Sequence, residues 1–148
     1  MRIAVVCLGN ICRSPMAAAV LRHKLDKAGL GDEVTVSSAG TGDWHIGASA
    51  DRRARAALRA RGYPDEHRAR QFGRADFAEH DLVLAMDTAN VRDLRRIAPT
   101  EDVEIRLFDT VDVPDPYYGD ATDFDAALDQ IEAAANALIA ELRAQLQR

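Results

Sequence analysis

The chain has 148 residues, of which 24 are acidic and 19 basic, giving a formal net charge of −5. This length predicts a single domain, residues 1–148, with one well-packed core. The acidic balance argues against a nucleic-acid partner, and the lack of a long apolar stretch argues against a membrane-spanning helix. The apolar start at residues 3–8 is too short for a secretory signal, so we expect a cytoplasmic protein.

Strand-like and helix-like segments alternate along the chain. We predict strands near residues 2–6, 34–37, 82–86 and 104–107, and helices near 15–28, 50–61, 88–97 and 122–147. This alternation predicts an α/β fold, a three-layer doubly wound sandwich with a four-stranded parallel sheet. The last helix has the clearest pattern, because its apolar residues recur at spacings of four and three: Phe124, Leu128, Ile131, Ala135, Leu138 and Leu142. Binding sites in such folds form at the carboxyl ends of the strands.

The segment that follows the first predicted strand has the features of an anion site. The strand is a short β-branched apolar run, and Ser14 and Pro15 then favour a helix start, with Ser14 as the expected N-cap. A loop between a strand end and a helix N-terminus directs N–H groups inward, and the helix dipole adds partial positive charge. We therefore expect residues 7–14 to bind a phosphate.

The residue types in this loop fit phosphate chemistry. Cys7 is a candidate nucleophile, Arg13 offers a planar fork for two phosphoryl oxygens, and Ser14 can hydrogen-bond the sulfur. Gly9 and Asn10 tolerate the left-handed backbone that the loop needs. The plainer interpretation is a buried thiol beside a surface arginine. Zinc binding by Cys7 and Cys12 is disfavoured because the usual second pair of ligands is missing.

The run Cys7-Leu8-Gly9-Asn10-Ile11-Cys12-Arg13-Ser14-Pro15 resembles the phosphate loop of the low-molecular-weight protein tyrosine phosphatases. A second motif of that family, Asp115-Pro116-Tyr117-Tyr118-Gly119, lies far downstream, where the family carries its general acid. Expulsion of a phenolate from phosphorus independently requires a nearby acid. The residues alone leave other candidates open, namely Asp109, Asp112 and Asp120, and the resemblance favours Asp115.

The resemblance implies a phosphatase that works without a metal or another cofactor. It implies a phosphocysteine on Cys7, phosphotyrosine-containing proteins as substrates and inorganic phosphate as product. It also implies a substrate cleft walled by Trp44, Tyr117 and Tyr118, and a loop braced by Ser38 and His67. Cys12 would pair with Cys7 in a protective disulfide, or alternatively serve as a small apolar filler.

Substrate choice depends on fewer residues. Ile11 is apolar, whereas the phosphoarginine phosphatases of this family carry Thr at that position, so the sequence favours phosphotyrosine. Two alternatives stay open, a phosphotyrosine-binding module without turnover and an enzyme for phosphoarginine or small aryl phosphates. An arginine-rich stretch over residues 52–74 is interpreted as a solvated helix face, with an acidic docking partner as the alternative.

Overall fold

The computed structural model describes residues 1–147 and contains one parallel sheet. Its strands are β1 (Arg2–Cys7), β2 (Thr35–Gly40), β3 (Leu82–Ala85) and β4 (Ile105–Leu107), in the order β2-β1-β3-β4. β1 is central, with Cys7 opposite Gly40 of β2 and Val6 opposite Ala85 of β3. The prediction of a four-stranded parallel sheet is confirmed.

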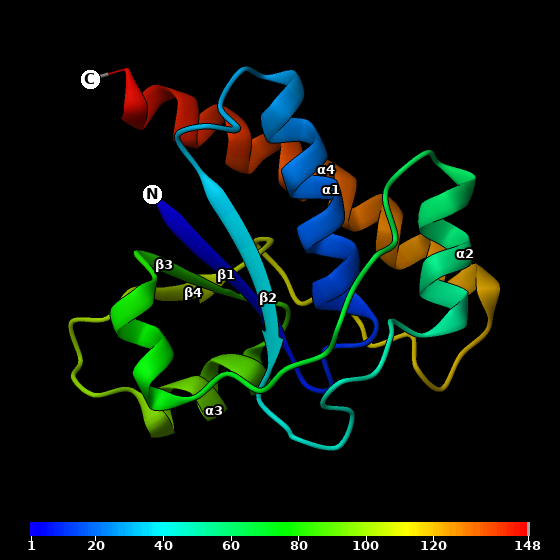
Figure 1. The fold of residues 1–148 in the computed structure, drawn as a ribbon, viewed down its shortest axis with the longest axis horizontal. Coiled ribbons are helices and arrows are strands. Elements are labelled where there is room, and N and C mark those ends of the chain that lie inside the picture. Colours follow the sequence, from blue (N-terminus) through cyan, green and yellow to red (C-terminus); the bar gives the residue numbers. More distant parts are fainter. Residues whose placement is uncertain (148) are drawn as a thin grey trace.

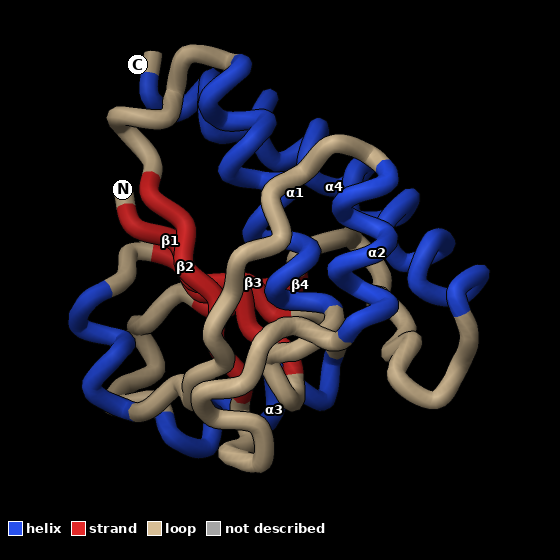
Figure 2. Tube along the Cα trace, turned by 45° about the vertical axis from the view of Figure 1, so that its right-hand side comes forward, coloured by secondary structure: helices blue, strands red, loops and turns tan. Residues whose placement is uncertain are grey.

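Helices cover both faces of this sheet (Figures 1 and 2). α1 (Arg13–Lys27), α2 (Arg52–Ala60) and α4 (Ala121–Leu146) lie on one side, and α3 (Thr88–Ile97) lies on the other. A short 3₁₀ helix, η1 (Arg74–Glu79), was not predicted, since one or two turns show no apolar periodicity.

Alternate residues of β1 supply the two cores. Ile3, Val5 and Cys7 belong to the core beneath α1 and α4, whereas Ala4 and Val6 belong to the smaller core beneath α3. A central strand that is buried on both faces accounts for the continuous apolar run in the sequence. Within residues 1–147, no helix has both the length and the apolar character needed to cross a membrane.

The start of α1 differs from the prediction. Its N-cap is Cys12, which makes no side-chain capping bond, and Ser14 lies within the first turn. The prediction of Ser14 as N-cap was wrong because the hydroxyl of Ser14 bonds to the sulfur of Cys7 instead of to a helix amide. The N-terminus of α1, next to the phosphate loop, therefore has no side-chain cap.

Candidate active site

Loops that follow all four strands meet at the carboxyl edge of the sheet. Cys7 ends β1, Trp44 follows β2, Asp87 follows β3 and Asp115 follows β4. The loops after β1, β2 and β4 surround a cleft of about 330 Å³, which is lined by Cys7, Leu8, Gly9, Ile11, Cys12, Arg13, Trp44, His45, Asp115, Tyr117 and Tyr118. Ten of these eleven residues were predicted for the site, and His45 was not. The predicted Asn10, Ser14, Ser38 and His67 are absent from the lining, and they support the loop.

The sulfur of Cys7 makes two hydrogen bonds inside the loop. The Ser14 hydroxyl lies 2.9 Å from Sγ, and the Asn10 backbone N–H donates to Sγ at 3.3 Å. Asn10 Nδ2 donates to Ser14 Oγ at 2.8 Å, so the single hydroxyl proton of Ser14 is shared between the sulfur at 2.9 Å and the Ala39 carbonyl at 3.4 Å, and the sulfur is the nearer acceptor. Both contacts suit a sulfur that carries negative charge.

Asn10 holds the loop in shape. It is the one non-glycine residue among residues 1–147 with a positive φ, 57°. Its Nδ2 also donates to Ser38 Oγ at 3.1 Å, its Oδ1 accepts from the Arg70 N–H at 2.9 Å, and its carbonyl accepts from His67 Nε2 at 2.6 Å. The predicted supporting contacts of Ser38 and His67 are thus present.

The glycines of the site act through close approach. Gly9 does not adopt the left-handed backbone predicted for it, and a Cβ there would lie 3.1 Å from the ring of His45. A Cβ on Gly40 would lie 2.7 Å from the Leu8 carbonyl oxygen and 3.1 Å from the Asn10 nitrogen. β2 can therefore support the loop only with glycine at its end.

Arg13 is 2% exposed, and part of its guanidinium is bound by protein. Nη1 donates to Asp87 Oδ2 at 2.6 Å and to the Val113 carbonyl at 3.0 Å, while Nη2 lies 3.6 Å from Asp115 Oδ2. Nε has no hydrogen-bond partner among the described residues. The hydrogen bond and charge of Asp87 help to raise the pKa of Arg13 against the opposing effect of burial. Protein groups thus bind Nη1 of Arg13, and its buried Nε–H is left to donate to an anion.

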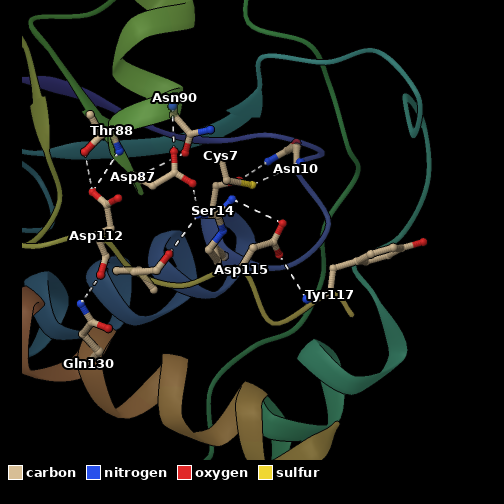
Figure 3. Close-up of polar contacts among 12 residues, drawn as sticks. Cys7, Asn10, Ser14, Asp87, Thr88, Asn90, Asp112, Asp115, Tyr117 and Gln130 are labelled. Atoms are coloured by element: carbon tan, nitrogen blue, oxygen red, sulfur yellow. Dashed lines mark hydrogen bonds and ion pairs between the residues drawn. The ribbon is translucent and has the colours of Figure 1, made fainter. Parts of the chain in front are cut away.

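The geometry distinguishes Asp115 from its three competitors. Asp109 Oδ2 accepts from Gln130 at 2.9 Å, Asp112 Oδ1 accepts from Thr88, and Asp120 caps α4. None of those three lines the cleft, whereas Asp115 does, and its Oδ1 accepts from the Tyr117 N–H at 3.1 Å. Figure 3 shows Cys7, Ser14 and Asp115 grouped together, with the Tyr117 ring extending away from them.

Aromatic side chains form the walls of the cleft. Trp44 is 67% exposed and Tyr118 is 93% exposed, so neither is a core residue. The rings of Tyr117 and Tyr118 meet edge to face at 5.0 Å, and the ring centroid of His45 lies 6.4 Å from that of Tyr117. Such exposed aromatic surface suits a flat apolar ligand.

Cys12 lies beside Cys7 in the lining of the cleft. Both thiols are free and buried. Burial is the main cause that raises the pKa of the Cys12 thiol, and Asp51 and Cys7 add to the effect. Cys12 is therefore a neutral thiol and a poor nucleophile. Among residues 1–147, no group of three or more His, Cys, Asp or Glu side chains is arranged to hold a metal ion.

Two charged residues of the site had no role in the sequence prediction. Asp87 bonds Arg13 and also caps α3 through the Asn90 N–H at 2.7 Å, and Arg70 supports Asn10. Asp87 directly follows a buried strand, and that position was the available signal. Arg70 supports the loop through its backbone N–H and also through its side chain, whose Nε donates to the Ser38 carbonyl at 3.1 Å.

Comparisons with known proteins assign the chain to a family. The sequence profile of the family described as low molecular weight phosphotyrosine protein phosphatase matches residues 2–148. A low molecular weight protein-tyrosine-phosphatase from Streptomyces coelicolor is 46% identical, over 99% of this chain and 96% of the relative. A low molecular weight phosphotyrosine protein phosphatase from Sus scrofa is 38% identical, over 93% of each chain.

Solved structures agree with this assignment. A protein tyrosine phosphatase from Entamoeba histolytica, crystallised with Hepes in its active site, superposes with a TM-score of 0.94 at 35% identity over 98% of each chain. The loop at Cys7, the cleft and these matches define a cysteine-dependent phosphatase fold. The chain belongs to the low-molecular-weight protein tyrosine phosphatase family.

Proposed function

We propose that this protein hydrolyses phosphotyrosine monoesters on proteins through a phosphocysteine on Cys7. The observation that carries the proposal is the position of Arg13, whose Nη1 bonds Asp87 and whose Nη2 lies 3.6 Å from Asp115 at the loop that surrounds the Cys7 sulfur. A nucleophile, a phosphate donor group and an acid thus share one cleft.

In the first step, the sulfur of Cys7 attacks phosphorus and the bond between phosphorus and the phenolic oxygen breaks. Arg13 and loop amides bind the equatorial oxygens, and the N–H groups of Gly9, Ile11 and Cys12 have no partner among residues 1–147. Asp115 gives its proton to the departing phenol. The product of this step is a phosphocysteine.

In the second step, Asp115 takes a proton from water, whose oxygen attacks phosphorus while the sulfur–phosphorus bond breaks. The electron pair returns to Cys7, where the Ser14 hydroxyl and the Asn10 N–H stabilise the thiolate. Inorganic phosphate leaves. Every proton and electron pair is accounted for by Cys7, Asp115 and water, so the cycle calls for no cofactor.

The substrate preference follows from the walls of the cleft. Trp44, Tyr117 and Tyr118 offer aromatic surface for a phenyl ring, and Ile11 adds an apolar side chain at the loop. A phosphoserine side chain is too short to use these walls. An apolar Ile11 also gives no hydrogen bond to a phosphoguanidinium group, which disfavours phosphoarginine.

We infer that residues 1–148 act as a single domain in the cytoplasm. That compartment is supported by the chemistry, because Cys7 must remain a thiol and reducing conditions keep it so. The partners are then phosphotyrosine-containing proteins, with neither nucleic acid nor membrane involved.

The test is phosphate release from a phosphotyrosine peptide by the reduced protein without added metal. Cys7→Ser should abolish release, and Asp115→Asn should lower kcat by roughly 10²-fold or more, the usual contribution of a general acid. Asp109→Asn is the matched control, because its carboxylate lies outside the cleft, and it should retain activity.

Each alternative has its own outcome. Release from phosphoarginine but not from phosphotyrosine would replace the substrate assignment. Tight phosphopeptide binding without release by the intact protein would indicate a binding module. Equal loss in Asp109→Asn and Asp115→Asn would contradict Asp115 as the acid.

A further inference from the structure

Arg53 connects the N-terminus of α2 to the loop that carries Asp115. Its Nη1 donates to the Gly119 carbonyl at 2.8 Å and its Nη2 donates to the Tyr117 carbonyl at 2.9 Å. The guanidinium also lies over the Tyr117 ring, 5.9 Å from its centroid, and over the Phe124 ring at 4.5 Å. One side chain therefore fixes the backbone two and four residues beyond Asp115.

Arg53 is itself held from behind. Asp51 Oδ1 accepts from the Arg53 backbone N–H at 2.8 Å and from Nε at 3.0 Å, and its Oδ2 accepts from Nη2 at 3.1 Å. The hydrogen bond with Arg53 lowers the pKa of the Asp51 carboxyl, so the pair stays charged at neutral pH. Asp51 thus accepts from the backbone N–H of Arg53 and from two nitrogens of its guanidinium, and the latter two bonds set the direction of the guanidinium.

The same short segment touches the phosphate loop. The Asp51 backbone N–H donates to the Ile11 carbonyl at 2.8 Å. Residues 51–53 thus bond the loop that holds the nucleophile on one side and the loop that holds the acid on the other. Asp115, Tyr117, Tyr118 and Gly119 are exposed and Pro116 is buried, so apart from the contact of Arg13 with Asp115 the two bonds from Arg53 are, within residues 1–147, the side-chain links that reach this loop from a distant segment.

We propose that Arg53 is a positioning residue that holds Asp115 at the correct distance from the phosphate loop. This inference rests on the proposed function, because positioning matters only if Asp115 protonates the leaving group. Its effect reaches the substrate through the backbone of residues 115–119, and Arg53 does not line the cleft.

The kinetic test compares aryl phosphates whose leaving phenols range from strongly acidic dinitrophenol to weakly acidic phenol. Arg53→Met keeps an unbranched side chain on Phe124 but removes the donors. It should lower kcat/KM for phenyl phosphate about tenfold or more, as a displaced catalytic group does, because kcat/KM reports the transfer of phosphate to Cys7, the step in which Asp115 protonates the phenol. The phenol of the dinitrophenyl ester leaves with little protonation, so kcat/KM for this ester should stay within about twofold of the parent value.

Three further variants separate positioning from general damage. Arg53→Lys restores the charge and one donor but cannot span both carbonyls, so it should recover part of the loss. In an Asp115→Asn background, Arg53→Met should cause no further decrease in kcat, because the two residues act through one step. Arg52→Ala, at the exposed neighbour on the same helix, is the control and should behave as the parent protein.

Amide hydrogen exchange tests the clamp, the two bonds from Arg53 to the Tyr117 and Gly119 carbonyls, without any turnover. Exchange across residues 117–119 should be faster in Arg53→Met than in the parent protein or in Arg52→Ala. Unchanged exchange, an equal loss of kcat/KM for every aryl phosphate, or an additional loss in the Asp115→Asn background would each overturn the inference. Failure of the parent protein to hydrolyse any aryl phosphate would instead overturn the proposed function, and the exchange result would still decide the clamp.

Discussion

At the scale of single residues, Arg13 illustrates how a buried cation is kept ready for an anion. Its guanidinium gives one nitrogen to Asp87 and Val113 and keeps Nε free of protein partners within residues 1–147. Asp87 also caps α3, so the same carboxylate fixes the cation and begins a helix. These two roles can be separated by substitution.

We predict different outcomes for Asp87→Ser and Asp87→Ala. Serine is a good N-cap but cannot form an ion pair with Arg13. Alanine can neither cap the helix nor pair with Arg13. Both variants should lose activity to a similar extent, because Arg13 loses its charged partner in each. Asp87→Ala should lose about 1 kcal/mol more unfolding free energy than Asp87→Ser, the usual cost of a lost cap. Urea unfolding and kcat measurements check this, and full activity in Asp87→Ser would contradict the role of the ion pair.

At the scale of elements, the arginine-rich stretch contacts α4 and the loop that carries Asp115. Arg61 bonds Asp129 at 2.8 Å and also pairs with Glu132, which ties the end of α2 to α4. Arg53 reaches the acid loop in the same way. The prediction of a solvated helix face was wrong for these two arginines. Their partners lie 64 to 71 positions away, a separation that a pattern within one segment cannot reveal.

Tyr63 adds to the junction between α2 and α4. Its hydroxyl donates to Glu132 Oε2 at 2.5 Å, and burial together with this bond raises the pKa of Tyr63 to about 12. Tyr63→Phe should lower the free energy of unfolding by about 1–2 kcal/mol at pH 7, since Glu132 loses a buried donor. The exposed Tyr118→Phe is the control and should change stability little.

The same bond predicts an alkaline pH dependence. A raised pKa in the folded state means that the contribution of Tyr63 is complete below the unfolded pKa of about 10. It is then lost as the pH rises through about 12. The stability difference between the parent protein and Tyr63→Phe should therefore shrink above pH 10. A constant difference up to pH 12 would contradict this assignment.

At the scale of the whole molecule, His67 makes the free energy of unfolding depend on pH in the mildly acidic range. Burial is the main cause that lowers the pKa of His67, and its Nε2 donates to the Asn10 carbonyl. A lowered pKa in the folded state means that the unfolded chain binds the proton more readily once the pH falls below about 6.5. The free energy of unfolding should thus fall with the pH below that value.

His67→Gln provides the comparison. The glutamine amide can donate to the Asn10 carbonyl but does not titrate. Denaturant unfolding at several pH values between 7 and 5 should give a smaller loss of stability in this variant than in the parent protein. Identical slopes in the two proteins would remove His67 as the cause.

The fold was largely predictable because strands and helices here have clear apolar patterns and a parallel sheet follows from their alternation. The lining of the cleft was predictable where the motifs carry their chemistry in side chains, as with Cys7, Arg13 and Asp115, which the structure brings together. Asn10 was only partly predictable, since its left-handed φ fits its residue type but its hydrogen bonds to Ser38 and Arg70 come from distant segments. Asp87 had only its position after a buried strand as a signal, and His45 and Arg53 contribute through contacts with distant segments, which the local sequence does not encode.

Because β1 is central in the sheet but first in the chain, the site can form only late in synthesis. Cys7 leaves the ribosome early, yet Arg13 bonds a carboxylate 74 positions later and a carbonyl 100 positions later. At ordinary elongation rates this interval is on the order of ten seconds. Throughout that interval the growing chain carries its reactive thiol without the partners that orient Arg13 or the acid that completes the reaction. We therefore expect each new molecule to have no phosphatase activity until nearly its whole length has been translated.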